Sequence, residues 1–167
     1  TGLVLLLAFA VFTSASVNPL YKGFGALNES QLTRGVEVIN RVDDSKWIST
    51  RNIFGPFILA GGAPSLSGVE AYPQLSMWQK YFPGKENIYN RYAHVTFDVD
   101  DSVNKRTLSL IQSDAFTVRL NSCDLMLKQE NVNYVIDTSG KEFQCFKVYS
   151  SYMVGDTPVN ILRRVTP

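Results

Sequence analysis

Histidine is almost absent from this sequence, because His94 is the only one in 167 residues. Cysteine is scarce as well, with only Cys123 and Cys145. A zinc site needs three or four ligands, so this supply does not favour one. A Ser-His-Asp triad would need His94 as its base, and no serine stands out as the nucleophile. No G-x-S-x-G, H-E-x-x-H, Walker or G-x-G-x-x-G motif is present in the sequence. We therefore predict no metal, no cofactor and no catalytic residue.

Net charge is also small, since 16 basic residues face 15 acidic ones and leave a formal charge of +1. Such a balance supplies no field that would hold nucleic acid or anionic lipid by electrostatics alone. We therefore expect no nucleic-acid partner. The two cysteines leave two alternatives open, either one disulfide outside the cytoplasm or two buried thiols. Their spacing does not decide between them.

The N-terminal stretch has no charged residue from Thr1 to Tyr21, and Gly2 to Phe12 is apolar throughout. A membrane-spanning helix needs roughly 20 such residues. We expect residues 1–18 to be the end of a transmembrane helix that begins upstream, with Pro19 closing it. One alternative is a signal-peptide core with Thr13-Ser14-Ala15 as its cleavage site, although the basic n-region is lacking. A buried core helix is disfavoured because the stretch is apolar on all sides.

The rest of the chain alternates helical and strand patterns. A capping signal at Asn28 precedes apolar residues at helical spacing, which predicts a helix that ends near Arg41. Two more helices are expected, from Pro73 to Tyr81 and from Asn121 or Ser122 to about Glu130. Strands are expected at residues 46–50, 57–60, 92–99, 106–111, 115–120, 132–136, 143–149 and 159–165. This order predicts an α/β (or α+β) fold, a mixed β-sheet with a few helices packed on it, forming one domain over residues 19–167.

The acidic segment Asp98-Val99-Asp100 invites three interpretations. As a calcium loop it fails, because Val103 occupies the glycine position and Ser109 the position of the bidentate acid. As the D-x-D motif of a nucleotide-sugar transferase it lacks the surrounding domain. We expect a solvated hairpin turn that leads from the strand at 92–99 to the strand at 106–111.

The candidate ligand site is centred on the start of the strand at 92–99. Alternation along this strand puts His94 on the face opposite its apolar side. Arg91 is suited to bind a phosphate or carboxylate bidentately, and a glycine turn lets backbone amides approach a ligand. The predicted ligand-binding residues are Asn90, Arg91, Tyr92, His94, Gly61, Gly62, Tyr72 and Trp78. In the competing interpretation Arg91 pairs with an acid such as Glu70 or Asp114, and the tyrosines only pack.

Several segments taken together resemble a known family. They are the apolar helix running into Val17-Asn18-Pro19-Leu20-Tyr21-Lys22-Gly23, Ala60-Gly61-Gly62, Ser67-Gly68-Val69 with Tyr72-Pro73, Tyr89-Asn90-Arg91-Tyr92-Ala93-His94, and Asn121-Ser122-Cys123-Asp124 ahead of Val132-Asn133-Tyr134-Val135-Ile136. The combination is similar to the C-terminal end of large multi-spanning bacterial membrane proteins related to GT-C glycosyltransferases, including the YfhO-like group. The resemblance covers nearly the whole chain.

The resemblance implies a last membrane helix followed by an extracytoplasmic domain at the bacterial cell membrane. It implies an accessory role in cell-envelope glycan assembly, with the lipid bilayer and a polyprenyl-phosphate-linked sugar or envelope glycan as partners. No catalytic residue is carried over, because the catalytic acid of GT-C enzymes lies in an early loop that this chain does not contain. Two alternatives stay open, a non-catalytic envelope binding or scaffold module and a small secreted protein with a cleaved signal peptide.

Overall fold

The computed structural model describes residues 27–165, together with Gly2, Val4, Leu6, Phe9 and Gly25. Its elements are, in chain order, α3 (Gln31–Asn40), β1 (Lys46–Ser49), η1 (Asn52–Phe54), α4 (Gly55–Ala60), β2 (Gly68–Glu70), α5 (Leu75–Tyr81), α6 (Glu86–Tyr89), β3 (Ala93–Val99), β4 (Thr107–Gln112), β5 (Ala115–Leu120), α7 (Leu125–Gln129), β6 (Val132–Asp137), β7 (Phe146–Val154) and β8 (Thr157–Arg164). The predicted membrane segment 1–18 falls outside the described residues, apart from four single positions. Within the described part of the chain, no helix has the length and apolarity needed to cross a membrane.

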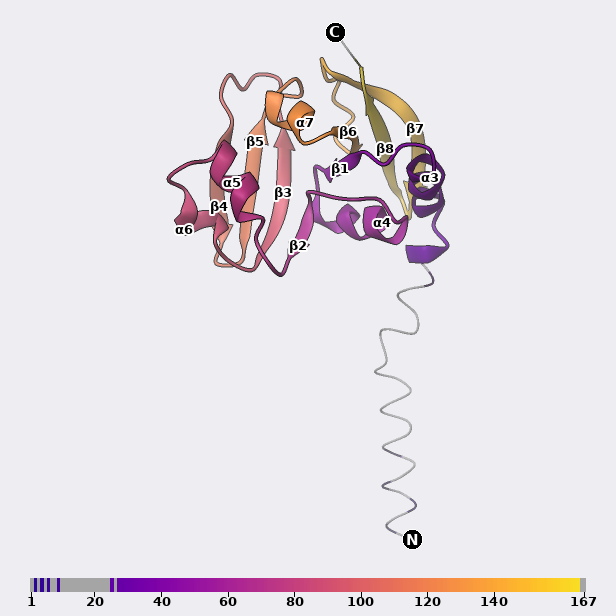
Figure 1. The fold of residues 1–167 in the computed structure, drawn as a ribbon. Helices are drawn as coiled ribbons and strands as arrows, with labels where there is room; N and C mark the ends of the chain where they lie inside the picture. Colours follow the sequence, from indigo (N-terminus) through magenta and orange to yellow (C-terminus); the bar gives the residue numbers. More distant parts are fainter. Residues whose placement is uncertain are drawn as a thin grey trace.

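The strands form two mixed sheets of four (Figure 1). Sheet A has the order β1-β6-β8-β7, and sheet B has the order β2-β3-β5-β4. Pairing is parallel between β1 and β6 and between β3 and β5, while the other pairs are antiparallel. The mixed α/β class predicted from the sequence is therefore confirmed, with two sheets in place of one.

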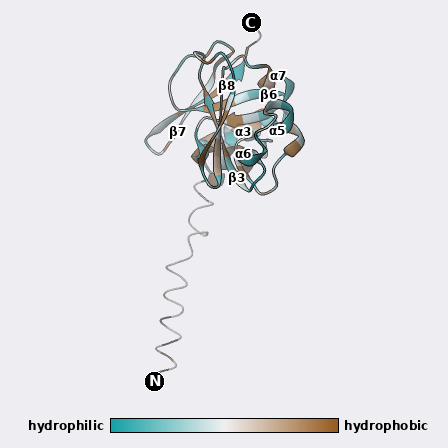
Figure 2. Cartoon of the chain, turned by 90° about the vertical axis from the view of Figure 1, so that its left-hand side faces the viewer, coloured by the Kyte–Doolittle hydropathy of each residue, from teal (hydrophilic) through white to brown (hydrophobic). Residues whose placement is uncertain are grey.

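Two hydrophobic cores hold these layers together. One lies where α3 and α4 meet sheet A, and it contains Leu32 and Val36 with Trp47 stacked on Tyr134 at a ring distance of 4.5 Å. The other contains residues of both sheets and of α5, α6 and α7. Figure 2 shows hydrophobic colour on strands in the middle of the fold and hydrophilic colour on much of the surrounding helices and loops. Because β6 contributes to both cores, sheet A is covered on both faces.

The loop before β2 joins the free edge of β1. Leu66 N–H donates to the Trp47 carbonyl over 2.9 Å, and Ser49 N–H donates to Ser67 Oγ over 2.6 Å. These bonds bring β2, the edge strand of sheet B, beside the edge of sheet A. An apolar groove lies at this junction.

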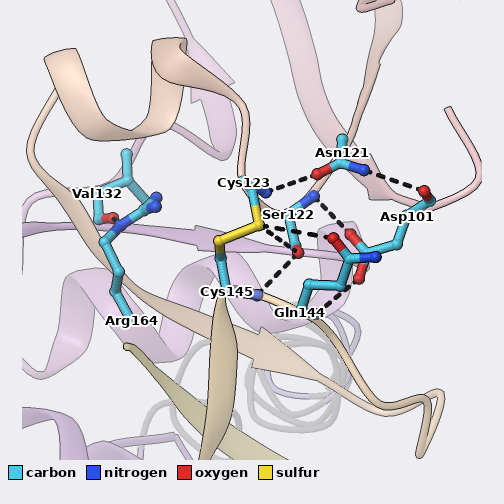
Figure 3. Close-up of a disulfide and its surroundings, with 8 residues drawn as sticks. All are labelled: Asp101, Asn121, Ser122, Cys123, Val132, Gln144, Cys145 and Arg164. Atoms are coloured by element: carbon cyan, nitrogen blue, oxygen red, sulfur yellow. Dashed lines mark hydrogen bonds between the residues drawn. A yellow bond between two sulfur atoms is a disulfide. The ribbon is translucent and has the colours of Figure 1, made fainter. Parts of the chain in front are cut away.

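A disulfide between Cys123 and Cys145 resolves the alternative that the sequence left open (Figure 3). The bond ties the segment before α7 to the residue before β7. Asp101 reinforces it, because one carboxylate oxygen accepts from Ser122 N–H at 2.8 Å and the other from Gln144 N–H at 2.7 Å. Three loops distant in sequence are thereby joined at one point.

Most of the predicted elements are found in the structure. The helix ending near Arg41 and the strand of residues 115–120 are confirmed, and the helix expected from Pro73 to Tyr81 begins two residues later, at Leu75. The core face of β3 is confirmed as well, since its four predicted apolar residues, Ala93, Val95, Phe97 and Val99, are at most 4% exposed. The caps differ by a few positions. Ser30 rather than Asn28 caps α3, and Asp124 rather than Asn121 or Ser122 caps α7.

Two structural predictions are wrong. Residues 57–60 were expected to form a strand but lie in helix α4, where Pro56 occupies the first turn and preorganises the helix. The strand β4 does not form a hairpin with β3, because β5 lies between them. Asp100 accepts from the Ser102 and Val103 amides in a turn that follows β3, and Asp98 and Asp100 both form ion pairs with Arg119 of β5.

Candidate functional site

The structure does not bring the eight predicted ligand-binding residues together. Trp78 is 0% exposed and lies in the core of sheet B, with its ring edge-on to Phe116 at 5.3 Å. Its indole N–H donates to Glu70 over 3.2 Å. Burial raises the pKa of the Glu70 carboxyl, and hydrogen bonds from Trp78 and Gln74 offset this only in part. Trp78 therefore packs inside the protein.

The glycine turn lies against a different helix. Gly61 is buried, and a Cβ at this position would come within 2.6 Å of Val36 Cγ1 on α3. Gly62 has a φ of +78°, which favours glycine, and its carbonyl accepts from Asn40 Nδ2 at 3.0 Å. Both glycines are explained by the packing of α3 against α4 and by the turn that follows.

Arg91 has a structural role, but its partners differ from the acids named in the competing interpretation. Its guanidinium donates to the Ser113 carbonyl over 2.7 Å and to the Asn87 carbonyl. No ion pair with Glu70 or Asp114 is found in the described part of the chain, so the acid partner proposed for Arg91 is wrong. The side chain joins α6 to the turn between β4 and β5.

The remaining predicted residues are more accessible. Tyr72 is 90% exposed, Tyr92 is 53% exposed, and Asn90 is exposed at the end of α6. The ring of His94 is edge-on to Tyr92 at 6.1 Å and lines an apolar groove. A ligand role for these four residues stays a prediction.

A second pocket, which we call the cationic pocket, has a volume of 830 Å³. This volume falls within the range of about 300–1,000 Å³ that is usual for small-molecule sites. Its lining residues are Lys80, Tyr81, Phe82, Pro83, Lys85, Lys105, Arg106, Thr107, Leu108 and Ser109. Four of them are cationic and none is acidic. The end of α5 and the turn that follows it supply one wall, and the first residues of β4 with the two residues before them supply the other.

Two of the four cations belong to the wall. Lys80 lies over the Tyr81 ring with its Nζ 4.5 Å from the centroid, and the Arg106 guanidinium carbon lies 5.4 Å from the same centroid. Arg106 Nε is also 3.3 Å from a carboxylate oxygen of Asp124. Such contacts fix Tyr81 and Arg106 in place.

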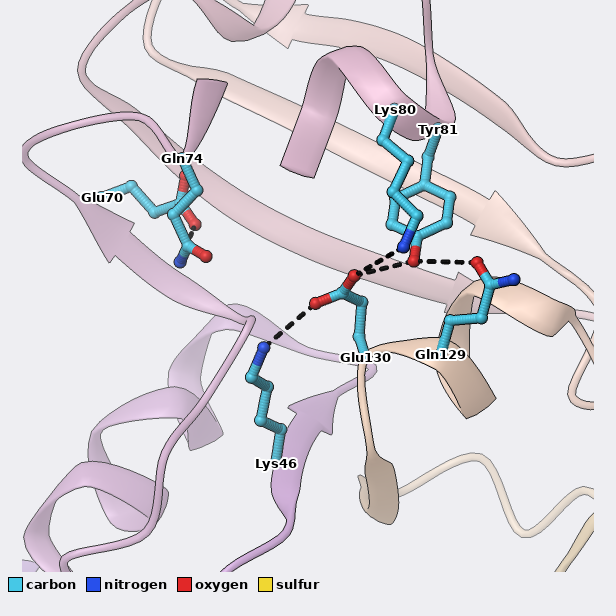
Figure 4. Close-up of polar contacts among 7 residues, drawn as sticks. All are labelled: Lys46, Glu70, Gln74, Lys80, Tyr81, Gln129 and Glu130. Carbon is cyan, nitrogen blue, oxygen red and sulfur yellow. Dashed lines mark hydrogen bonds and ion pairs between the residues drawn. The ribbon is translucent and has the colours of Figure 1, made fainter. Parts of the chain in front are cut away.

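Glu130 contacts the side chains of Tyr81 and Lys80 in this wall (Figure 4). Its carboxylate accepts from Tyr81 Oη at 2.7 Å and from Lys46 Nζ at 3.0 Å, and Lys80 Nζ lies 3.6 Å away. Burial would raise the pKa of Glu130, but the bonds from Tyr81 and Lys46 outweigh it, so the pKa lies below its usual value. Burial and the Glu130 bond raise the pKa of Tyr81. Glu130, which lies outside the lining, is therefore an ionised carboxylate, and the Tyr81 phenol in the wall is neutral.

The other two cations, Lys85 and Lys105, have no side-chain hydrogen bond or ion pair to any residue that the structure describes. Both are exposed, and the hydroxyl-bearing residues Thr107 and Ser109 lie beside them in the lining. An anion with several oxygens would find two uncompensated ammonium groups and nearby hydroxyl donors here. Charge-assisted bonds of this kind are roughly twice as strong as neutral ones.

This pocket could not be predicted from the sequence, because its two halves are separated in the chain. The available signals were Lys85 after the Pro83-Gly84 turn and the basic pair Lys105-Arg106 before a strand. Neither is distinctive alone. The pocket forms only because β4 is the outer strand of sheet B, next to α6.

Metal binding finds no support in the described residues, which hold no group of three or more His, Cys, Asp or Glu side chains suited to an ion. Among known proteins, no curated protein and no solved structure matches the chain. One family model does match, over residues 26–161, and this is most of the chain. The chain therefore belongs to the family described as Domain of unknown function (DUF7654).

Proposed function

We propose that this chain is a non-catalytic, anion-binding domain on the extracytoplasmic side of a bacterial membrane. Its parent would be a multi-spanning glycosyltransferase-like protein that acts in cell-envelope glycan assembly. The observation that carries the binding role is the cationic pocket, where Lys85 and Lys105 face solvent beside a fixed wall of cations and one phenol.

Two further observations support the location. Disulfides form and persist in oxidising compartments, and Cys123 is bonded to Cys145. The N-terminal sequence is uncharged to Tyr21 and apolar from Gly2 to Phe12, as expected for the end of a membrane helix. Both fit a domain that leaves the membrane on its outer side.

The ligand follows from the chemistry of the pocket. Two free ammonium groups and adjacent hydroxyls suit a phosphate, pyrophosphate or carboxylate group. Among envelope molecules, these groups occur in polyprenyl-phosphate-linked sugars and in acidic glycans. The pocket would hold the anionic group of such a donor or acceptor while chemistry takes place elsewhere in the parent protein.

Binding of inorganic pyrophosphate to the full chain in neutral detergent tests this function. We expect Lys85→Ala with Lys105→Ala to weaken binding by about a hundredfold, because one charge-assisted hydrogen bond contributes about 1.5 kcal/mol and two are lost. Affinity should also fall with added salt, since the pocket is open to solvent and the Debye length shrinks to about 8 Å at 0.15 M. Calorimetric titration at two salt concentrations measures both effects.

The matched control replaces two exposed lysines outside the pocket, Lys128→Ala with Lys147→Ala, which removes the same net charge. This control should bind pyrophosphate as the unchanged protein does. Equal weakening in both double variants would mean that only net charge matters, and the pocket would not be a site.

A further inference from the structure

An apolar groove lies at the junction of the two sheets and has a volume of 670 Å³. Its lining residues are Leu27, Asn28, Asn52, Ile53, Gly55, Pro56, Leu59, Ala60, Gly68, Val69 and His94. No lysine, arginine, aspartate or glutamate is among them. In Figure 1 its elements α4 and β2 form the lower edge of the domain, the same edge from which the described chain begins.

Three large apolar side chains of this groove face solvent. Ile53 of η1 is 62% exposed, Leu59 of α4 is 58% exposed, and Val69 of β2 is 53% exposed. They come from three consecutive elements and converge on one surface. A contiguous apolar surface without charge marks an interaction site with another protein or with a membrane.

The chain itself indicates which occupant to expect. Leu27 lines the groove, and the apolar run of the sequence ends at Phe12. The residues between them span at most about 50 Å, even when fully extended at about 3.5 Å per residue. Val4 and Leu6 within the apolar run are 69% and 68% exposed, so these side chains do not fill the groove. The apolar run and the groove are both more stable in an apolar environment. The chain between them is short enough for both to contact the same bilayer.

We propose that the apolar groove docks the domain onto the surface of the lipid bilayer, with Ile53, Leu59 and Val69 entering the interfacial region. Burying such side chains is favourable, and the tether keeps the groove at high effective concentration near the lipid. The inference rests on the membrane location in the proposed function, but it does not depend on the cationic pocket.

Docking would also orient the cationic pocket. Val69 pairs with His94 at the start of β3, whereas Thr107 pairs with Arg119, which pairs with Asp98 near the end of β3. The two ends are about 13 Å apart at about 3.3 Å per residue. The groove therefore faces the bilayer while the cationic pocket lies at the opposite end of sheet B and opens to the aqueous side, which favours an acidic glycan over a lipid-linked sugar as its ligand.

The test uses the full chain in phosphatidylcholine nanodiscs that contain a nitroxide-labelled lipid. We expect the methyl NMR signals of Ile53, Leu59 and Val69 to be lost by paramagnetic broadening. Val42 and Val148, which are 86% and 61% exposed on other elements, should keep their signals as matched controls. Ile53→Ser with Leu59→Ser should then restore the signal of Val69. Because both side chains are already exposed, the variant should fold normally.

Two outcomes would overturn the proposal. Groove methyls that stay as sharp as Val148 would show that lipid does not reach them. Groove methyls shielded from a water-soluble paramagnetic agent but not broadened by the labelled lipid would show that protein fills the groove. Pyrophosphate titration in the same nanodiscs separates this result from the proposed function, because the serine variant should keep its pyrophosphate affinity whichever occupant is found.

Discussion

Trp78→Ala should lower the free energy of unfolding by about 3–5 kcal/mol, the range found when a large core aromatic is removed. Trp78 is 0% exposed and contacts Phe116 and Phe82 at ring distances of 5.3 Å and 6.1 Å. Its loss leaves a cavity beside sheet B. It also removes a hydrogen-bond donor from Glu70, whose carboxyl is already penalised by burial. Urea unfolding of the full chain in neutral detergent, followed by circular dichroism, measures this loss.

Tyr72→Ala is the matched control, since Tyr72 was predicted to line the same ligand site but is 90% exposed. We expect it to change the free energy of unfolding by no more than about 0.5 kcal/mol, as for an ordinary surface substitution. A Trp78 variant as stable as the Tyr72 variant would contradict the buried position of the indole.

Removal of the disulfide, by Cys123→Ala with Cys145→Ala, should cost about 3 kcal/mol. The bond closes a loop between residues 22 positions apart, and cutting it frees the unfolded chain. It also holds Ser122 and Gln144 where their backbone amides reach the two carboxylate oxygens of Asp101 (Figure 3). Its loss therefore weakens the point where three loops are joined.

Reductant provides the control for this prediction. The unchanged protein should lose about the same 3 kcal/mol when urea unfolding is repeated with reductant. The double variant should be insensitive to reductant, because it has no disulfide left to reduce. Unfolding curves of the unchanged protein that coincide with and without reductant would contradict the role given to the bond.

The sequence was sufficient to predict those elements whose local pattern agrees with their packing. The alternation along β3 and the periodicity of α3 each point to one buried face, and both are present in the structure. Residues 57–60 were mispredicted because a short apolar run fits a buried strand as well as a helix. Pro56 was the signal that favours a helix start.

Pairing between strands was harder to predict than the strands themselves. The polar segment after β3 is typical of a hairpin turn. The next strand, β4, nevertheless lies at the far edge of sheet B, and β5 lies between β3 and β4. Nothing local in residues 98–106 indicates that crossing. The crossing is accompanied by contacts with Arg119, which comes later in the chain and pairs with both Asp98 and Asp100.

The prediction of the candidate site depended on local composition, which does not show the partners that the fold supplies. Composition near β3 favoured Arg91 as a ligand-binding cation, but its two terminal nitrogens each donate to a backbone carbonyl, of Ser113 and of Asn87. Lys85 and Lys105 carry no local motif, and they become a candidate site only because the fold places them in one pocket with no acid. Whether a charged side chain has a partner depends on the tertiary structure and not on the neighbouring sequence.

The position of a bound anion tests the central claim most directly. Backbone and side-chain NMR spectra of the full chain in neutral detergent would be recorded during a titration with inorganic pyrophosphate. We predict that the resonances of Lys85, Lys105 and Ser109 shift with a common saturation curve. Shifts confined to Gly62 and Asn90, or no saturable shift at any residue, would contradict the assignment of this pocket as the binding site.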